Sequence, residues 1–338
     1  MRRRWLVAIG LVIALVAAAC GNDDDDGAAA SDSNDDADET AAAEDTDTGQ
    51  ETDLRFAMVT HGDGGSFWSV AQRGAEQVAA DLGVQVNYQE SNNDPERQAQ
   101  LIQQAVADGV DGLAVSAPNP EGIEDAVRAA VDADIPVITL NSGLDSFEEF
   151  GAITHVGQTE TIAGEQAGQR LADEGGTNLL CVIHEQGNIG LQERCDGAGD
   201  GFGGDVEDFQ VTGTGDISTT QTELQTKLQS DTSVDAVLAL NPDIAIAARD
   251  AIAAAGSSAT LATFDLSGDV VQAIEDGEIA FAVDQQQYLQ GYLPVVFLYL
   301  FNTNSNTVGG GLPVLTGPGF VDESNAADVA ELASAGTR

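Results

Sequence analysis

Polar side chains follow several short apolar runs of this sequence, at the points where the runs end. Asn141 follows Ile138-Thr139-Leu140, and His184, Asn241 and Asp265 follow comparable runs later in the chain. If the runs are parallel strands, these residues meet beyond the carboxyl ends of the strands, where open sheets bind their ligands. Amide and carboxylate groups in such a place are suited to hydrogen bonds with hydroxyl groups.

A glycine-rich segment, residues 61–68, leads into two adjacent aromatic residues, Phe67 and Trp68. Aromatic rings at this position can stack on the apolar face of a sugar ring. The alternative is that they pack a helix onto the sheet; because adjacent residues point in different directions, we expect at least one ring to reach the cleft. The segment lacks both the lysine of a GxxxxGK[ST] loop and the G-x-G-x-x-G spacing, so no phosphate cradle is predicted.

Histidines near strand ends raise the question of a metal centre or an enzyme. His61, His155 and His184 all lie there, Glu185 follows one of them, and three histidines in one cleft could bind zinc. The chain has no H-E-x-x-H or G-x-S-x-G motif and no close carboxylate pair placed to act on a substrate. We therefore predict no catalysis, no metal and no cofactor.

From residue 54 onward, short apolar runs alternate with amphipathic stretches of about 12 to 16 residues, which is typical of βαβ units with a parallel sheet. The first series predicts strands at 56–60, 84–88, 112–116 and 136–140, with helices at 67–82, 95–107 and 121–131. The second predicts strands at 179–183, 206–211, 236–240, 261–264 and 279–283, with helices near 221–228, 244–255 and 270–274. A helix at 286–301 and a Gly/Pro-rich tail at 309–319 follow. The fold class predicted is α/β, with two doubly wound parallel-sheet lobes.

Three segments match motifs of one family. Gly65-Ser66-Phe67-Trp68 stands against Asn-Pro-Phe-Phe, residues 135–141 read IPVITLN against IPVITLD, and Glu193-Arg194 with Gly201-Phe202 stands against R-x-x-G-F. Over residues 54–322 the chain thus resembles the type I periplasmic sugar-binding proteins, the ribose and galactose binders that serve ABC transporters.

The resemblance implies a set of ligand-binding residues. Further matches are Leu240-Asn241, Phe264-Asp265 and Asp284-Gln285, and the predicted set is Phe67, Trp68, Asn141, Gln158, Arg194, Asn241, Asp265 and Gln285. Arg194 would offer a fork of donors and Asp265 would accept from two hydroxyls. Departures from the family pattern are Asn141 for Asp, Gly65 for Asn, and Ala117 and Gly215 for an Asn and a Phe of the ribose binder. We expect a pocket that differs from a ribose pocket and is larger.

The tail at 315–322 resembles the closing segment of one branch of the family, which crosses between the lobes a third time. The resemblance implies a hinge near Val156, Gln285 and Thr316. The predicted N-terminal lobe is 54–155 with 286–313, and the C-terminal lobe is 156–285 with 314–338. A cleft that closes by rotation of two lobes can bury its ligand and signal occupancy.

The N-terminus has the order of a secretory signal peptide: an arginine cluster at 2–4, an apolar run at 5–16, then Ala17-Ala18-Ala19-Cys20. A membrane-spanning helix is the alternative, but it needs about 20 apolar residues. The small residues before Cys20 resemble a bacterial lipobox, so residues 1–19 are predicted to be cleaved and Cys20 lipidated. Ala17 stands where Leu is usual, which leaves cleavage without lipidation as an alternative.

Acidic residues outnumber basic residues over the whole chain, 57 to 12. Residues 20–53 contain 14 of them and no Lys or Arg, which predicts a solvated, disordered tether. The whole chain has a formal net charge of −45, which excludes nucleic acid as a partner because such binding depends on Lys and Arg. Beyond Cys20 only Cys181 and Cys195 remain, and outside the cytosol this pair can form a disulfide.

These observations predict an extracytoplasmic solute-binding lipoprotein, anchored to the outer face of the cell membrane or periplasmic. It would capture a monosaccharide or polyol as a monomer and deliver it to the permease of an ABC importer. A sensory binder that presents an autoinducer-like sugar, and a nucleoside or amino-acid binder, are the alternatives. The sequence does not separate uptake from sensing, and it does not identify the sugar.

Overall fold

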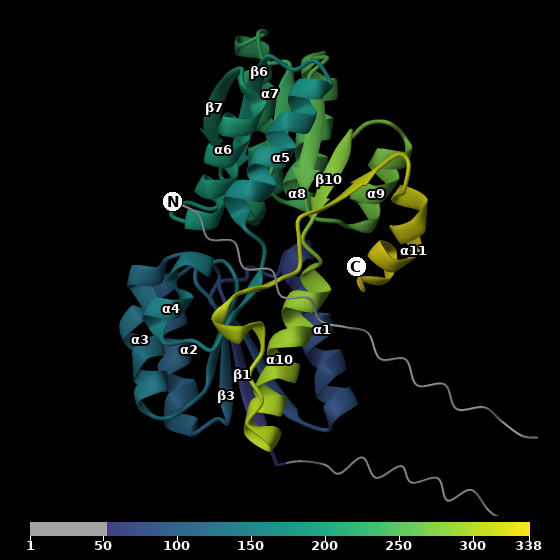
Figure 1. The fold of residues 1–338 in the computed structure, drawn as a ribbon. Coiled ribbons are helices and arrows are strands. Elements are labelled where there is room, and N and C mark those ends of the chain that lie inside the picture. The colour runs from purple at the N-terminus through teal and green to yellow at the C-terminus, as the bar shows by residue number, and fades with distance from the viewer. Residues whose placement is uncertain (1–52) are drawn as a thin grey trace, which may run out of the picture. The chain divides into compact units, whose positions relative to one another are not determined.

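The computed structural model describes residues 53–338, which form two α/β lobes, each built on a six-stranded sheet (Figure 1). The first sheet is parallel throughout and has the order β11-β5-β4-β3-β1-β2. Its strands are β1 Arg55–Thr60, β2 Gln85–Glu90, β3 Gly112–Ser116, β4 Val137–Asn141, β5 His155–Gly157 and β11 Val314–Leu315. The second sheet has the order β12-β10-β9-β8-β6-β7, and only its β10–β12 pair is antiparallel. Its strands are β6 Asn178–Ile183, β7 Asp205–Gln210, β8 Ala236–Ala239, β9 Thr260–Phe264, β10 Phe281–Asp284 and β12 Gly319–Asp322.

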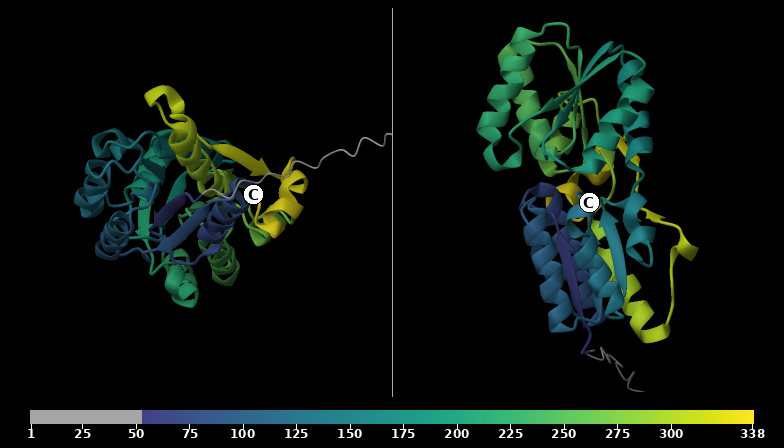
Figure 2. Two further views of the ribbon diagram at one scale, coloured as in Figure 1. Left: turned by 90° about the horizontal axis from the view of Figure 1, so that it is seen from below. Right: turned by 90° about the vertical axis from the view of Figure 1, so that its left-hand side faces the viewer.

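Helices cover both faces of each sheet (Figure 2). Those of the first lobe are α1 Ser66–Leu82, α2 Pro95–Asp108, α3 Pro120–Asp132, α4 Phe147–Phe150 and α10 Gln287–Asn304. Those of the second are α5 Glu160–Asp173, α6 Ile189–Phe202, α7 Ile217–Ser230, α8 Pro242–Ala255, α9 Gly268–Glu275 and α11 Ala326–Ala335. Short 3₁₀ turns lie at Leu144–Ser146, Thr214–Asp216 and Gly309–Gly311. None of the helices in this described part of the chain is long and apolar enough to span a membrane.

Successive side chains of a strand point to opposite faces of the sheet, which explains why helices pack on both faces. In β1, Phe56 and Met58 face the cluster under α1 and α10, whereas Ala57 and Val59 face the cluster under α2 and α3. A strand buried on both faces reads as a continuous apolar run, which is why these strands could be located from the sequence. The fold class predicted from the sequence, two doubly wound parallel-sheet lobes, is confirmed.

The α5–α6 pair of the second lobe was not predicted, and glycines bring its two helices into direct contact. A Cβ added to Gly168 would lie 2.2 Å from the carbonyl oxygen of Ala198, and one added to Gly197 would lie 2.1 Å from that of Thr161. The two helix backbones therefore touch. This contact fixes α6, the helix that carries Arg194.

We expect Gly168→Ala to lower the free energy of unfolding by about 1 to 3 kcal/mol, because the new methyl group must push α5 and α6 apart. Gly199→Ala is the matched control: it lies in α6, and a Cβ added there would have no atom within 4 Å. At this position, alanine should be neutral or stabilise the helix by up to about 1 kcal/mol. Urea unfolding measures both, and equal stabilities for the two variants would contradict this account of the helix pair.

The chain crosses between the sheets three times, after β5, after β10 and between β11 and β12. The predicted lobe boundaries lie at 155 and 313; in the structure the first sheet continues to Gly157 and includes Val314–Leu315. The predicted signal peptide, the lipidated Cys20 and nearly all of the predicted tether, residues 20–52, lie outside the described residues.

Candidate functional site

A cavity lies between the two lobes, at the carboxyl ends of the strands. Its walls are His61, Phe67, Trp68, Asn141, Ser142, His184, Glu185, Asn188, Gly190, Leu191, Arg194, Leu240, Asn241, Asp265 and Gln285. Seven of the eight residues predicted to bind the ligand therefore line one cavity. The exception is Gln158, which is fully buried and instead donates to the Glu160 carboxylate at 2.8 Å. Gln158 directly follows β5, and this places it behind Glu160 rather than on the cavity wall.

The first lobe supplies an aromatic wall. Phe67 and Trp68 are the second and third residues of α1, and their ring centroids are 4.9 Å apart with an interplanar angle of 79°. The His61 ring meets Trp68 edge to face at 4.7 Å. Both aromatic residues line the cavity, so the wall offers ring surface and ring edge to the apolar CH groups of a ligand.

Arg194 is the positive charge of the cavity, and Glu160 holds it in place. The guanidinium donates to both Glu160 oxygens, from Nε at 2.7 Å and from Nη2 at 3.0 Å. Its Nη1 donates to the Leu240 carbonyl at 3.3 Å, and the group lies 4.5 Å from the centroid of the Phe264 ring. Burial alone would lower the pKa of Arg194, but the paired Glu160 carboxylate raises it. The guanidinium is thus a fixed, charged donor before any ligand arrives.

Asp265 is the buried acceptor opposite these donors. It follows β9 with a left-handed φ of 70°, and Asn141, the last residue of β4, has a φ of 60°. Such conformations are costly for residues other than glycine and occur where a side chain must be aimed at a site. Burial raises the pKa of Asp265 to about 7, although Arg194 and the amide of Gln285, which donates to it at 2.8 Å, both oppose the shift.

Amide side chains connect the cavity to the hinge. Asn141 Nδ2 donates to Gln290 Oε1 at 3.2 Å, and Gln290 Nε2 donates to Gln285 Oε1 at 2.8 Å and to Thr316 Oγ1 at 3.2 Å. Gln285, Gln290 and Thr316 are buried. Gln290 was not predicted as part of the site; the available signal was a glutamine at the start of an otherwise apolar helix.

The three histidines lie in two different places, two beside the cavity and one within the first sheet. His61 and His184 lie beside Glu185, with Nε2 to carboxylate distances of 3.6 and 3.8 Å, whereas His155 bonds to Thr139 at 2.9 Å within the first sheet. Burial lowers the pKa of His61 to about 3, so its ring is neutral at physiological pH. His184 Nδ1 is buried without a hydrogen-bond partner, which makes it a polar group that a ligand could satisfy.

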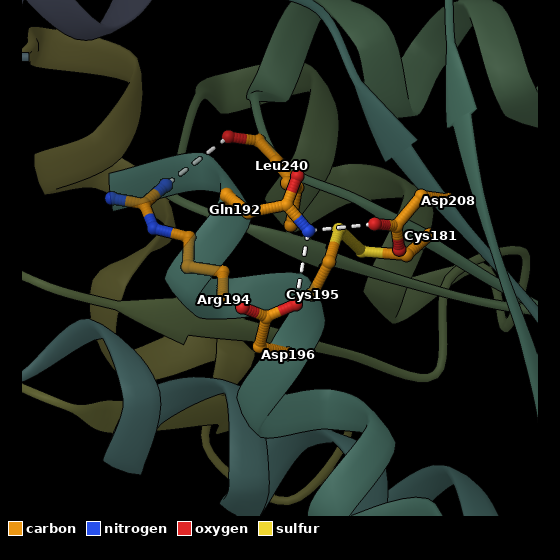
Figure 3. Close-up of a disulfide and its surroundings, with 7 residues drawn as sticks. All are labelled: Cys181, Gln192, Arg194, Cys195, Asp196, Asp208 and Leu240. Atoms are coloured by element: carbon orange, nitrogen blue, oxygen red, sulfur yellow. Dashed lines mark hydrogen bonds between the residues drawn. A yellow bond between two sulfur atoms is a disulfide. The ribbon is translucent and has the colours of Figure 1, made fainter. Parts of the chain in front are cut away.

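A disulfide joins Cys181 of β6 to Cys195 of α6, with a Cα–Cα distance of 5.8 Å. Figure 3 shows Arg194, the residue before Cys195, extending from α6 away from the sulfur atoms toward Leu240. Within residues 53–338, these two cysteines and Asp208 are the one group of three potential metal ligands whose donor atoms all lie within 4.8 Å of one another. Because both sulfurs are in the disulfide, this group is structural.

The lobes touch each other across the mouth of the cleft. Ser66 of the first lobe donates to Asp243 of the second, Asn93 Nδ2 donates to Glu185 at 3.3 Å, and the Ile189 amide donates to the Pro118 carbonyl at 3.0 Å. Since Ser66, Asn93 and Pro118 all belong to the first lobe and their partners to the second, the cleft is in a closed arrangement.

Comparisons with known proteins agree with this geometry. The family model of the periplasmic binding protein domain matches residues 56–301. A carbohydrate transporter from Acidothermus cellulolyticus 11B, solved in complex with myo-inositol, is 42% identical with a TM-score of 0.83 and covers 85% of this chain and 100% of its own. The xylose/arabinose-binding protein XylF of Sulfolobus acidocaldarius is 25% identical over 80% of this chain and 71% of its own. The ribose import binding protein RbsB of Haemophilus influenzae is 28% identical over 68% of this chain and 79% of its own.

Proposed function

Since the chain belongs to the periplasmic binding protein family, we propose that it captures a neutral monosaccharide or polyol between its lobes and delivers it to an ABC-type importer. The observation that carries the proposal is the closed cavity, which combines two aromatic rings with a fixed guanidinium and a buried carboxylate. A ring with several hydroxyl groups suits both walls, because it has apolar CH groups and groups that donate and accept hydrogen bonds.

The charges in the cavity favour a neutral ligand. Arg194 is already neutralised by the bidentate contact with Glu160, and the other charged side chains on the wall, Asp265 and Glu185, are acidic. A carboxylate or phosphate on the ligand would meet a net negative surrounding and would compete with Glu160. This argues against amino acids and sugar phosphates as ligands.

A cyclic polyol is the first candidate within this class. The Acidothermus cellulolyticus protein, solved with myo-inositol, is 42% identical to this chain over most of its length. We propose that Phe67 and Trp68 cover one face of such a ring. Its hydroxyls would bond to Asn141, Arg194, Asn241, Asp265 and Gln285, and one could satisfy His184 Nδ1.

The location follows from the family and from the N-terminal sequence. Periplasmic binding proteins are extracytoplasmic transport components and not enzymes. We propose that Cys20 carries the lipid anchor and that residues 20–53 form the acidic tether between the membrane and the two lobes. The hydroxyl-bearing ligand then reaches the permease when the closed protein docks on it.

A thermal-shift screen of the purified protein tests the proposed ligand class. The panel holds pentoses, hexoses, myo-inositol and other polyols, with nucleosides, amino acids and sugar phosphates as the contrasting classes. A ligand at about 100 times its Kd stabilises the native state by about 2.7 kcal/mol, and we expect a rise in melting temperature of about 5 °C or more with a neutral sugar or polyol. A rise only with amino acids, nucleosides or phosphates, or with no compound at all, would contradict the proposal.

A further inference from the structure

The N-terminus of α1, at the mouth of the cleft, has no cap from its own lobe at Ser66. The residue in the N-cap position is Gly65, which offers no side-chain hydrogen bond, and the first turn of α1 contains no acidic residue. A helix N-terminus has free N–H groups and a partial positive charge, and both favour a carboxylate. In the open protein this end of α1 lacks one at Ser66.

The second lobe supplies this missing carboxylate. The Oδ2 atom of Asp243 accepts from the Ser66 amide at 3.1 Å and from the Ser66 hydroxyl at 3.1 Å. Asp243 is the second residue of α8, whose own N-terminus is already capped by the Asn241 side chain at 2.8 Å from the Asp243 amide. The Asp243 carboxylate therefore lies at the N-termini of α8 and α1. Because α8 does not need it as a cap, it can cap α1 across the cleft.

We propose that Asp243 is a closure latch, a positioning residue that caps α1 only when the lobes close around the ligand. The proposal rests on the proposed function, since ligand capture is the event that closes the cleft. Phe67 and Trp68 directly follow Ser66, so the latch also fixes the aromatic wall against the ligand. Because the contact exists only between the lobes, its free energy adds to the closed state and slows ligand release.

A second carboxylate, that of Asp63, lies beside the contact between Ser66 and Asp243. Asp63 of the first lobe accepts from the Gly65 amide at 3.0 Å and from the hydroxyl of Thr214 in the second lobe. A Cβ at Gly65 would lie 3.0 Å from Asp63 Oδ1 and 3.3 Å from Asp243 Oδ2, so both carboxylates approach the same turn. The positive end of α1 is what allows two acidic side chains to meet there.

The latch is tested from both sides of the cleft. Asp243→Ala removes the acceptor. Ser66→Pro removes both donors, and it should leave α1 intact because proline is favoured at the first helical position and Gly65 has the extended conformation that must precede it. Asp269→Ala is the matched control, since Asp269 is the exposed second residue of α9 in the same lobe.

Affinity for the polyol found in the screen is measured by calorimetry. Its dissociation rate is followed by the fluorescence of Trp68, the one tryptophan of residues 53–338. We expect Asp243→Ala and Ser66→Pro each to weaken binding about five- to twentyfold, mainly through faster dissociation, because a lost cap is worth about 1 to 2 kcal/mol. The double variant should lose no more than either single variant, and Asp269→Ala should stay within twofold of the wild type.

The outcomes separate the latch from the proposed function. A wild-type protein that binds no member of the panel overturns the proposed function and the latch that depends on it. A wild-type protein that binds, together with Asp243→Ala and Ser66→Pro variants whose dissociation rates equal that of Asp269→Ala, overturns the latch alone. Additive losses in the double variant also overturn it, because they would mean that the two residues act separately.

Discussion

Replacing Arg194 by methionine should abolish polyol binding and also lower the free energy of unfolding by about 3 to 5 kcal/mol. The two effects have one cause. Arg194 donates from Nε and Nη2 to Glu160, and both side chains are buried. Without the guanidinium, the Glu160 carboxylate is left unpaired behind the cavity, and the ligand loses its charged donor. Calorimetry and urea unfolding measure the two losses, and we expect at least a hundredfold loss of affinity.

A second variant separates the role in binding from the role in stability. Arg194→Met combined with Glu160→Met removes the whole ion pair, and replacing a buried pair by apolar side chains is often neutral for stability. The double variant should therefore regain most of the unfolding free energy but none of the binding. If it bound the polyol with the wild-type affinity, Arg194 would be a structural residue and not a ligand donor.

Replacing Asp265 by asparagine should weaken binding about a hundredfold at pH 8 and remove its dependence on pH. We propose that the carboxylate accepts from two ligand hydroxyls, and a hydrogen bond to a charged group is worth about 1.5 to 3 kcal/mol. Burial raises the pKa of Asp265 to about 7. Hydroxyl donors favour the ionised form, so a proton bound below pH 7 must leave when the ligand binds, and wild-type affinity should fall by up to about tenfold per pH unit below that value.

Calorimetry from pH 5 to pH 8, in buffers with different ionisation enthalpies, measures both the affinity and the released proton. Glu193→Gln is the control, because burial and nearby carboxylates raise the pKa of Glu193 to about 7 as well, yet Glu193 does not line the cavity. This variant should keep the pH dependence of the wild type. A wild-type affinity that is constant across the range would show that the ionisation of Asp265 is not coupled to binding.

The sequence located residues that lie at strand ends or in short family motifs. Strand ends indicated Asn141, Asn241 and Asp265, because buried strands are recognisable as apolar runs. A short sequence motif indicated Arg194. The sequence could not locate residues whose place depends on packing between elements. Glu160 was missed because nothing local indicates that the start of α5 lies beside Arg194 of α6.

The same limit applies to the α5–α6 pair and to Gln158. These helices contact each other through glycines, and their apolar stripes include small residues such as Ala163, Ala167 and Ala198, so the pattern did not predict them. Gln158 follows a strand, as Asp265 and Gln285 do, but its amide donates to Glu160 and it does not line the cavity. Asp243 was not distinguishable from any acidic residue in the first turn of a helix, because its partner lies in the other lobe.

Calorimetric titration of the purified protein with myo-inositol and with the best compound of the thermal screen tests the central claim most directly. We expect a neutral polyol to bind with one molecule per chain, and we expect no heat of binding from the Arg194→Met, Glu160→Met variant, in which the cavity has lost its fixed donor. Unchanged binding by that variant, or saturable binding only of a charged ligand by the wild type, would contradict capture of a neutral polyol in this cleft.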